Sequence, residues 1–336
     1  MLGLSRRHHY KYPSVQMEDG RGRSAATPSD IPKAGWKDIL WRTWEEQGKD
    51  NIAIVAAGVA YYALFAIFPA IAALVSIYGL AFDPAGVERQ IGLLSDFLPP
   101  EALAVLSDQA RSVATAPRQG LGFGVLFGFA LTLWSASRGT NSLITALNIA
   151  YGEEERRGFI RLALISLGLT IAALLFLIVT LALIVAVPAA INLLGLQGTV
   201  FAWVASLARW PILAVAIMVV LAVLYRYGPD RREPKWRWVS WGSAIATILW
   251  ILASVGFSLY VSHFGSYNQT YGSVGAGVVL LLWFNLTSYV ILMGAELNAE
   301  IEHQTARDTT RQKGTGEKPI GTRDAHVADT VGRRRA

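Results

Sequence analysis

The sequence predicts an all-α membrane protein: a bundle of six transmembrane helices with both termini in the cytoplasm. Hydrophobic residues make up 53% of the chain and charged residues only 16%, against about 45–50% and about 25% in soluble domains. Most charges lie before Asn51, after Glu300, or in short clusters between long uncharged runs. A soluble helical protein would carry charges along the outer face of every helix, so this class is excluded.

Six segments supply the roughly 20 mostly apolar residues that a helix needs to cross a bilayer. They are residues 52–81, 121–141, 160–187, 201–225, 239–261 and 274–298. Because the number of segments is even, both termini are expected on the same side of the membrane.

The placement of Lys and Arg predicts which side that is. Of the 30 Lys and Arg residues, 26 lie in the first fifty residues, in 138–161, in 226–237 or in the C-terminal tail. Since cytoplasmic segments are enriched in Lys and Arg, both termini are expected in the cytoplasm. We interpret the basic cluster in 226–237 in the same way, as an orientation signal in contact with lipid headgroups. Nucleic-acid binding is not expected, because no aromatic side chain accompanies Arg333–Arg335.

The regions outside the segments are polar. Residues 1–33 and 304–336 are predicted to be disordered tails, which leaves residues 34–303 as the membrane domain. The stretch GWKDILWRTWEEQGKD predicts an amphipathic helix, in which Trp36, Leu40 and Trp44 recur every four residues. This helix is expected to lie in the cytoplasmic interface, or to pack its tryptophans against the bundle.

The outer connection 82–119 predicts a small helical hairpin. Asp83–Pro84 resembles a helix start, and Pro99–Pro100 divides the segment into two helices. We expect this hairpin to cap the mouth of the bundle, with a gating role as the alternative.

Several residues within the segments have special geometry. Pro69 is expected to kink the first segment. Tyr61 and Tyr62 lie at a depth where a phenol hydroxyl needs a partner or water, which is typical of a transport cavity or of a purely structural kink. Small residues at intervals of four allow a close helix contact, within the chain or with another copy: Gly120, Gly124 and Gly128.

Polar residues gather at the predicted cytoplasmic ends of three segments: Asp50, Asn51, Arg138, Asn141, Glu296 and Asn298. An isolated charge within an apolar helix is costly, so we expect Arg138 and Glu296 to face the bundle interior, with Arg138 paired to Glu296 or Asp50. This set is either a staple that holds helix ends together or a vestibule in which the Arg138 guanidinium binds an anion. Both interpretations stay open.

The stretch SHFGSYNQTYGSVGAG at 262–277 is polar and glycine-rich but contains no Lys, Arg, Asp or Glu. Irregular backbone at membrane depth persists only when it is buried in protein or lines a watery cavity. We therefore predict a re-entrant hairpin, with contacts through Tyr260, Tyr267, Asn268 and Tyr271. His263 is interpreted as a hydrogen-bonded rim residue. The chain contains no cysteine, which excludes disulfides and thiolate metal sites, and no metal or cofactor is expected.

Five stretches resemble one known family, the YihY/virulence factor BrkB family. They are DNIAIVAAGVAYYALFAIFPA at 50–70, YG at 151–152, LYRYGPD at 224–230, WILASVGFSLYVSHFGSYNQTYGSVGAGVVLLLWF at 250–284 and GAELNAE at 294–300. The resemblance covers roughly residues 35–303. It implies a multi-pass protein of the bacterial inner membrane with six spans, linked to virulence and to the handling of envelope lipids, and without a settled biochemical activity.

The same resemblance brings the older label ribonuclease BN, which is generally regarded as mistaken. Metal-dependent ribonucleases need clustered ligands, whereas the five histidines here are scattered: His8, His9, His263, His303 and His326.

The leading functional hypothesis is a non-enzymatic membrane protein that transports or flips an amphipathic anionic envelope molecule, such as a lipid precursor. The alternative is a scaffold that binds lipids or envelope proteins without moving them, and a ribonuclease is a remote third. The expected partners are membrane lipids, with anionic lipids as one candidate class. A second copy of the chain or another envelope protein is an open alternative.

Overall fold

The computed structural model describes residues 20–22, 25–81, 123–231, 236–263 and 267–305. Within these residues the chain is helical and contains no strand, which confirms the all-α class. The helices are α1 (Lys33–Lys49), α2 (Ile52–Ala81), α5 (Phe123–Ala150), α6 (Phe159–Leu181), α7 (Val187–Leu193), α8 (Val200–Tyr227), α9 (Trp236–His263) and α10 (Tyr267–His303). A π-helical stretch, Ala182–Ala186, connects α6 to α7.

Four helical stretches in the described residues are long and apolar enough to cross a membrane: Phe159–Leu193, Val200–Tyr227, Val239–Val261 and Gly277–His303. A fifth is obtained if Lys33–Lys49 and Ile52–Ile67, which meet at an angle of 64°, form one bent span. The chain is therefore a helical membrane protein with four or five such stretches, and the count of six stays a prediction.

The helix bounds correct the sequence prediction in two places. Helix α5 continues to Ala150, nine residues past the predicted end at 141. Helix α10 begins at Tyr267, so residues 267–277 are helical, and the prediction that they form an irregular re-entrant hairpin is wrong. The predicted outer hairpin at 82–119 lies outside the described residues.

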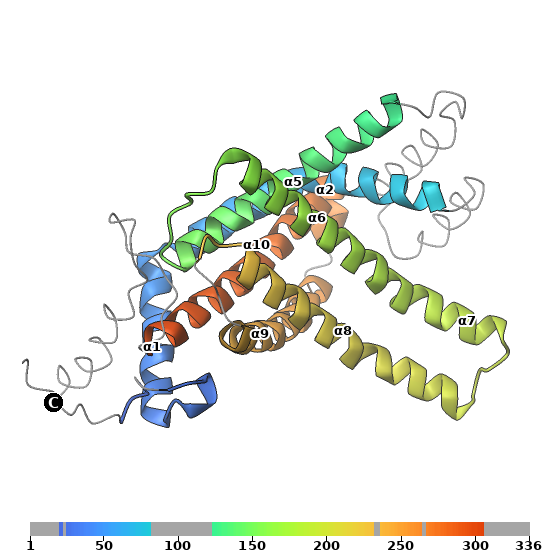
Figure 1. Cartoon of the computed structure of the whole chain (residues 1–336). Coiled ribbons are helices and arrows are strands. Elements are labelled where there is room, and N and C mark those ends of the chain that lie inside the picture. The colour runs from blue at the N-terminus through green and yellow to red at the C-terminus, as the bar shows by residue number, and fades with distance from the viewer. Residues whose placement is uncertain (1–19, 23–24, 82–122, 232–235, 264–266, 306–336) are drawn as a thin grey trace, which may run out of the picture.

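The helices are arranged around α10. Figure 1 shows α2 and α5 side by side, with α10 crossing beneath them, while α6–α7 and α8 form an antiparallel pair that extends away from this centre. One end of the bundle contains Asp50 and residues 151–158, 226–231 and 300–305, and we call it the charged end. Helices α2, α6 and α9 begin there, and α5, α8 and α10 end there.

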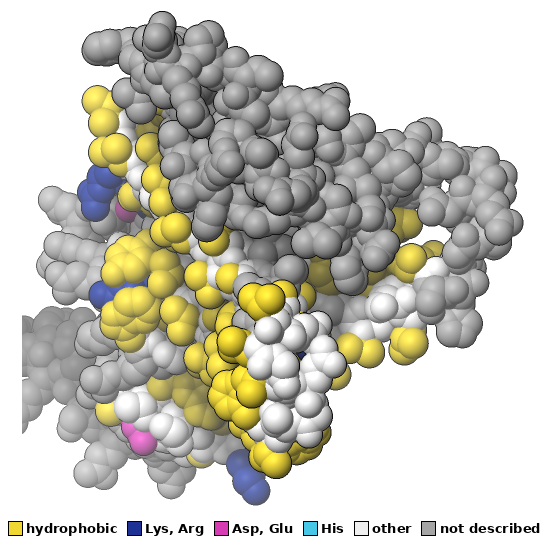
Figure 2. Space-filling model, turned by 90° about the vertical axis from the view of Figure 1, so that its right-hand side faces the viewer, with side chains coloured by type: hydrophobic (Ala, Val, Ile, Leu, Met, Phe, Trp, Pro, Cys, Tyr) yellow, Lys and Arg dark blue, Asp and Glu magenta, His cyan; other side chains and the backbone are white. Residues whose placement is uncertain are grey.

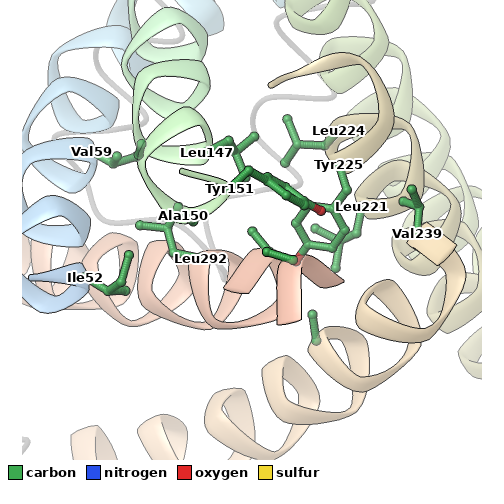
Figure 3. Packing of buried hydrophobic residues seen from close by; sticks show 14 of the residues in the cluster. Ile52, Val59, Leu147, Ala150, Tyr151, Leu221, Leu224, Tyr225, Val239 and Leu292 are labelled. Atoms are coloured by element: carbon green, nitrogen blue, oxygen red, sulfur yellow. The ribbon is translucent and has the colours of Figure 1, made fainter. Parts of the chain in front are cut away.

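The main hydrophobic core lies just inside the charged end. It joins the start of α2 to the ends of α5 and α8 and to α9 and α10, with Tyr151 and Tyr225 fully buried at its centre (Figure 3). The Tyr225 hydroxyl donates a hydrogen bond to the Ile291 carbonyl oxygen at 2.8 Å. Gly294 makes this contact feasible, because a Cβ there would lie 2.4 Å from the same hydroxyl.

Helix α1 packs across this end of the bundle. The chain turns sharply from α1 into α2 at Asn51, whose φ of 52° is in the left-handed region that Asn tolerates better than most residues. The buried face of α1 consists of Gly35, Ile39, Arg42 and Thr43. Of the three apolar residues that recur every four positions, Trp36 packs against Trp241 with ring centroids 5.5 Å apart. Leu40 and Trp44 are exposed.

Part of the predicted N-terminal tail is folded. Ala25 and Ile31 are buried in a second cluster with Ile39, Leu297 and Ile301, and the Arg21 carbonyl oxygen accepts a hydrogen bond from Gln304. Disorder throughout residues 1–33 is therefore wrong for this portion. Its few apolar residues pack into a small site between α1 and α10.

The outer surface of the bundle is apolar. Figure 2 views the molecule from the side where α7 and α8 are joined, and its described surface is largely hydrophobic with few charged side chains. Exposed leucine, isoleucine, valine and tryptophan side chains follow α6 and α8 along their length. A surface of this kind is expected to face lipid.

Candidate functional site

The last turns of α10 place three buried glutamates at the charged end: Glu296, Glu300 and Glu302. Glu300 forms an ion pair with Arg42 of α1 and a contact of 3.2 Å with His303. Arg42 also donates to the Glu300 carbonyl oxygen at 3.2 Å and to Gln304 at 2.7 Å. These contacts fix α1 against the end of α10.

Glu302 is paired with a second arginine, Arg231, at 2.6 Å, and both side chains are fully buried. The guanidinium carbon of Arg231 lies 4.1 Å from the ring centroid of Tyr151. Burial lowers the pKa of Arg231, but Glu302, Tyr151 and Glu153 together raise it by more, so the pKa lies above its usual value. Arg231 is therefore a buried cation in a structural pair, and its interpretation as a headgroup contact is wrong.

Asn298 connects α10 to α9. Its Oδ1 accepts a hydrogen bond from the Gly242 backbone N–H at 2.9 Å, and its side chain is fully buried. A Cβ on Gly242 would lie 2.3 Å from this oxygen, so glycine is needed where the two helices approach. Asn298 is a packing residue in this structure.

The turn after α5 is held by a polar network. The Asn148 amide donates to Glu155 at 3.0 Å and accepts from the Asp230 backbone N–H at 2.8 Å. Arg157 bridges Glu155 and the Gly228 carbonyl oxygen, at 2.5 Å and 2.8 Å. Two connections that are far apart in sequence are thereby joined at the charged end.

Glu296, unlike Glu300 and Glu302, has no paired cation among the described residues. Its side chain is buried, with 2% of the residue exposed. Among the described residues, its Oε1 atom has no hydrogen-bond partner and its carboxyl group forms no ion pair. The prediction that Glu296 faces the protein interior is correct, but its predicted pairing with Arg138 does not occur.

Arg138 lies elsewhere. It is 12 residues before the end of α5 at Ala150, about 18 Å from the charged end at about 1.5 Å per residue. Its side chain is exposed and makes no ion pair with Glu296, Asp50 or any other described residue. The prediction that Arg138 joins Glu296 and Asp50 in one vestibule is therefore wrong. Because the helix continues past residue 141, Arg138 lies mid-helix and well away from the helix end.

Arg138 lies beside the crossing of α5 and α2. A Cβ on the next residue, Gly139, would be 2.8 Å from the Ala66 Cβ and 3.7 Å from the Tyr62 carbonyl oxygen. Tyr61 and Tyr62 are both more than half exposed, and the ring centroids of Tyr61 and Phe65 lie 4.9 Å apart. An exposed guanidinium and an exposed aromatic group therefore occur at similar depth on two packed helices.

The other predicted residues are distributed as follows. Asn141 Oδ1 lies 3.5 Å from the Ser166 hydroxyl of α6, while Asp50 is the C-cap of α1 and Asn51 forms the bend. Helix α2 continues through Pro69. Tyr260 is exposed and its ring stacks on Phe257 at 6.4 Å.

For some of the predicted residues the structure gives the helix and no side-chain contact. Tyr267, Asn268 and Tyr271 lie in the first turns of α10, and Gly124 and Gly128 lie near the start of α5. Gly120 is outside the described residues.

The sequence interpretation missed Arg42 and Arg231 as partners of Glu300 and Glu302. Neither glutamate was assigned a role from the sequence, and nothing in the sequence indicated which cation each would meet. In the described part of the chain, no group of three or more His, Cys, Asp or Glu side chains could hold a metal ion.

Comparison with known proteins agrees with this architecture. The sequence model of a family described as "Virulence factor BrkB" matches residues 43–318. The chain belongs to the BrkB family. A ribonuclease-like protein of Bacillus subtilis, YfkH, is 33% identical over 270 residues, which cover 78% of this chain and 93% of that protein.

Relatives of the BrkB-family protein also include proteins named for the membrane. A UPF0761 membrane protein of Pseudoalteromonas atlantica is 26% identical over 83% of this chain and 96% of its own length. One of Vibrio parahaemolyticus is 28% identical over 76% and 79%. No solved structure matches the chain.

Two of the stretches that resemble the family meet at the charged end. GAELNAE at 294–300 supplies Glu296, Asn298 and Glu300, while LYRYGPD at 224–230 supplies Tyr225 and Asp230. Tyr225 belongs to the main hydrophobic core. Asp230, Asn298 and Glu300 make the polar contacts described above. The charged end of this BrkB-family protein is therefore built in part from family motifs.

Proposed function

We propose that this BrkB-family protein moves an amphipathic anionic molecule across the bacterial inner membrane, with a phospholipid-like envelope molecule as the substrate class. The observation that carries the proposal is the exposed guanidinium of Arg138 in the middle of α5, beside the crossing with α2. When the charged end lies at the membrane surface, Arg138 lies near the middle of a hydrocarbon core about 30 Å thick.

A cation at that depth is costly to insert, by about 2.5–3.5 kcal/mol on translocon scales. The cost is offset when an anionic group accompanies the guanidinium, and Arg is well suited to phosphate because it donates two parallel hydrogen bonds. The apolar surface on α2 around Tyr61, Tyr62 and Phe65 would accommodate the chains of the same molecule. A headgroup site half-way across the bilayer is what lipid movement requires.

The membrane arrangement belongs to the same proposal. We propose six crossings with both termini in the cytoplasm, in which α2 and α5 join the four apolar stretches of α6–α7, α8, α9 and α10. The concentration of Lys and Arg at the charged end and in the tails supports this orientation. Because the chain has no cysteine, a single cysteine can be introduced at Ser29 or at Gln197. Labelling with a membrane-impermeant thiol reagent then reports on which side of the membrane each position lies. Labelling of both from the same side would contradict the orientation.

The test of function is a scrambling assay in proteoliposomes. Acyl-labelled fluorescent phosphatidylglycerol is reduced from outside by dithionite, and acyl-labelled phosphatidylcholine serves as the zwitterionic comparison. We expect the protein to expose inner-leaflet phosphatidylglycerol, and Arg138→Ala to slow this by about tenfold or more, since a charge-assisted hydrogen bond contributes roughly 1.5–3 kcal/mol.

Arg161→Ala is the matched control, because Arg161 is also exposed but lies at the start of α6. Equal rates for protein-free vesicles and proteoliposomes would contradict transport. Retained lipid binding without movement would favour the scaffold instead. A nuclease is the weaker alternative, in view of the ligand groups that the described residues lack.

A further inference from the structure

We propose that Glu296 is a proton-binding site at the charged end of the bundle. Its role in coupling proton binding to the movement of the anionic molecule rests on the proposed function, whereas the site itself does not.

The first argument is the contrast among three glutamates on one helix end. Glu300 is neutralised by Arg42, and Glu302 by Arg231. Glu296 is as deeply buried as these two, yet the described residues give it no cation, and its Oε1 atom has no hydrogen-bond partner. One acid in the set is thus left without the compensation that the fold provides for the other two.

The second argument is the set of charged groups around Glu296. Those that act on it most strongly are Asp50 and Glu46 from the end of α1, and Glu300 and His303 from α10. Three of these four are acids. Tyr151, which directly follows α5, also lies within the range of the Glu296 charge.

The other helices that pack on α10 add little positive charge. Helix α2 contains no acidic or basic residue, Arg138 is the only one in α5, and Arg237 and His263 are the only ones in α9. Arg138 is exposed far from the charged end, and His263 lies at the opposite end of α9.

The chemical consequence follows from burial and like charge. A carboxylate that lies buried with an unpaired oxygen and acidic neighbours is strongly unfavourable. Binding one proton converts it to a neutral carboxyl group, which removes the repulsion and supplies an O–H donor. Among the acids around Glu296, Glu46 lies at the solvent boundary, with 34% of its side chain exposed.

The direct test is infrared spectroscopy of the purified full-length protein. A protonated carboxyl group has a C=O stretching band that an ionised carboxylate lacks. We expect this band in the wild type at neutral pH, its loss in Glu296→Gln, and its retention in Glu154→Gln, which alters an exposed acid. Absence of the band from the wild type, or its persistence in Glu296→Gln, would overturn the proposal.

Thermal unfolding in detergent provides a second readout. Glu296→Gln is isosteric with the protonated acid and should leave the melting temperature unchanged. Glu302→Gln removes the partner of a buried arginine and should lower it by several degrees. An equal drop in both variants would show that Glu296 is charged and paired, contrary to the proposal.

Coupling is tested in the same proteoliposomes under an imposed pH gradient. Phosphatidylglycerol movement should respond to the gradient in the wild type and lose that response in Glu296→Gln. A band that depends on Glu296, together with movement that ignores pH, would refute coupling and retain the site. If no lipid moves under any condition, the proposed function fails, while the infrared result still decides whether Glu296 binds a proton.

Discussion

Arg231 and Glu302 form a fully buried ion pair, with Nη1 and Oε1 2.6 Å apart, that joins the end of α8 to the end of α10. The same guanidinium donates to the Tyr225 carbonyl oxygen at 3.1 Å and lies over the Tyr151 ring. The pair thus connects three of the helices that end at the charged end.

Breaking this pair should destabilise the fold strongly. Arg231→Met keeps an unbranched apolar side chain but leaves Glu302 buried without a counter-ion, which costs about 3–5 kcal/mol in comparable sites. Denaturant unfolding in detergent measures the change. Lys49→Ala is the control, because it breaks an exposed pair with Glu45 and Glu46 that contributes only about 0–1 kcal/mol. A small effect of Arg231→Met would show that the pair is not needed.

The close approach of α9 and α10 gives a second prediction. Gly242→Ala places a methyl group against Asn298, so we expect a loss of about 1–3 kcal/mol from overpacking. Gly256→Ala in the same helix meets nothing within 4 Å and should be neutral or stabilise by up to about 1 kcal/mol. Melting temperatures of the two variants test this, and equal effects would contradict the packing described for Gly242.

A third prediction concerns α1. Leu40, Trp41 and Trp44 are exposed on the face away from the bundle, and we expect them to lie in the membrane interface. A spin label attached at Leu40→Cys should be relaxed by lipid-soluble oxygen, and one at Glu45→Cys by a water-soluble nickel reagent. Water accessibility at both positions would show that α1 does not contact the membrane.

The turn after α5 should be pH-dependent. Burial raises the pKa of Glu155, but hydrogen bonds from Arg157 and Asn148 lower it by more, so the pKa lies below the ordinary value of 4.5. Because the folded pKa is depressed, the stabilisation is present above about pH 4.5 and is lost as the pH falls through the folded pKa. Wild type should therefore be more stable than Glu155→Gln at neutral pH, with the difference shrinking in acid. A difference that is independent of pH would contradict this role.

The helices could be predicted from the sequence because each long apolar run, bounded by charges, has one stable structure in a membrane. Helix α2 was predicted with its observed bounds, and α6, α8 and α9 nearly so. The end of α5 was misplaced because Ser135–Asn141 is polar enough to resemble a helix end, although the apolar residues that follow continue the helix to Ala150.

The candidate site was predicted only in part. The burial of Glu296 and Asn298 follows from isolated polar groups in an apolar helix, and the structure places both in the interior. The partners of the buried acids could not be predicted, because Arg42 is 258 residues from Glu300. Such pairings depend on how helices pack, and periodicity within one helix contains no information about them.

The helical start of α10 was missed for a related reason. Glycine and small polar residues at 267–277 indicate irregular backbone when considered locally. In a membrane, however, a helix satisfies every backbone hydrogen bond internally, and the stretch contains no proline to interrupt it. The backbone requirement therefore outweighs the local preference of these residues.

The central claim is that Arg138 binds an anionic headgroup within the membrane. It is tested most directly by measuring the binding of fluorescent phosphatidylglycerol and phosphatidylcholine to the purified protein in neutral detergent. The proposed function predicts tighter binding of phosphatidylglycerol to wild type and to Arg161→Ala, and loss of this preference in Arg138→Ala. An undiminished preference in Arg138→Ala would contradict the claim.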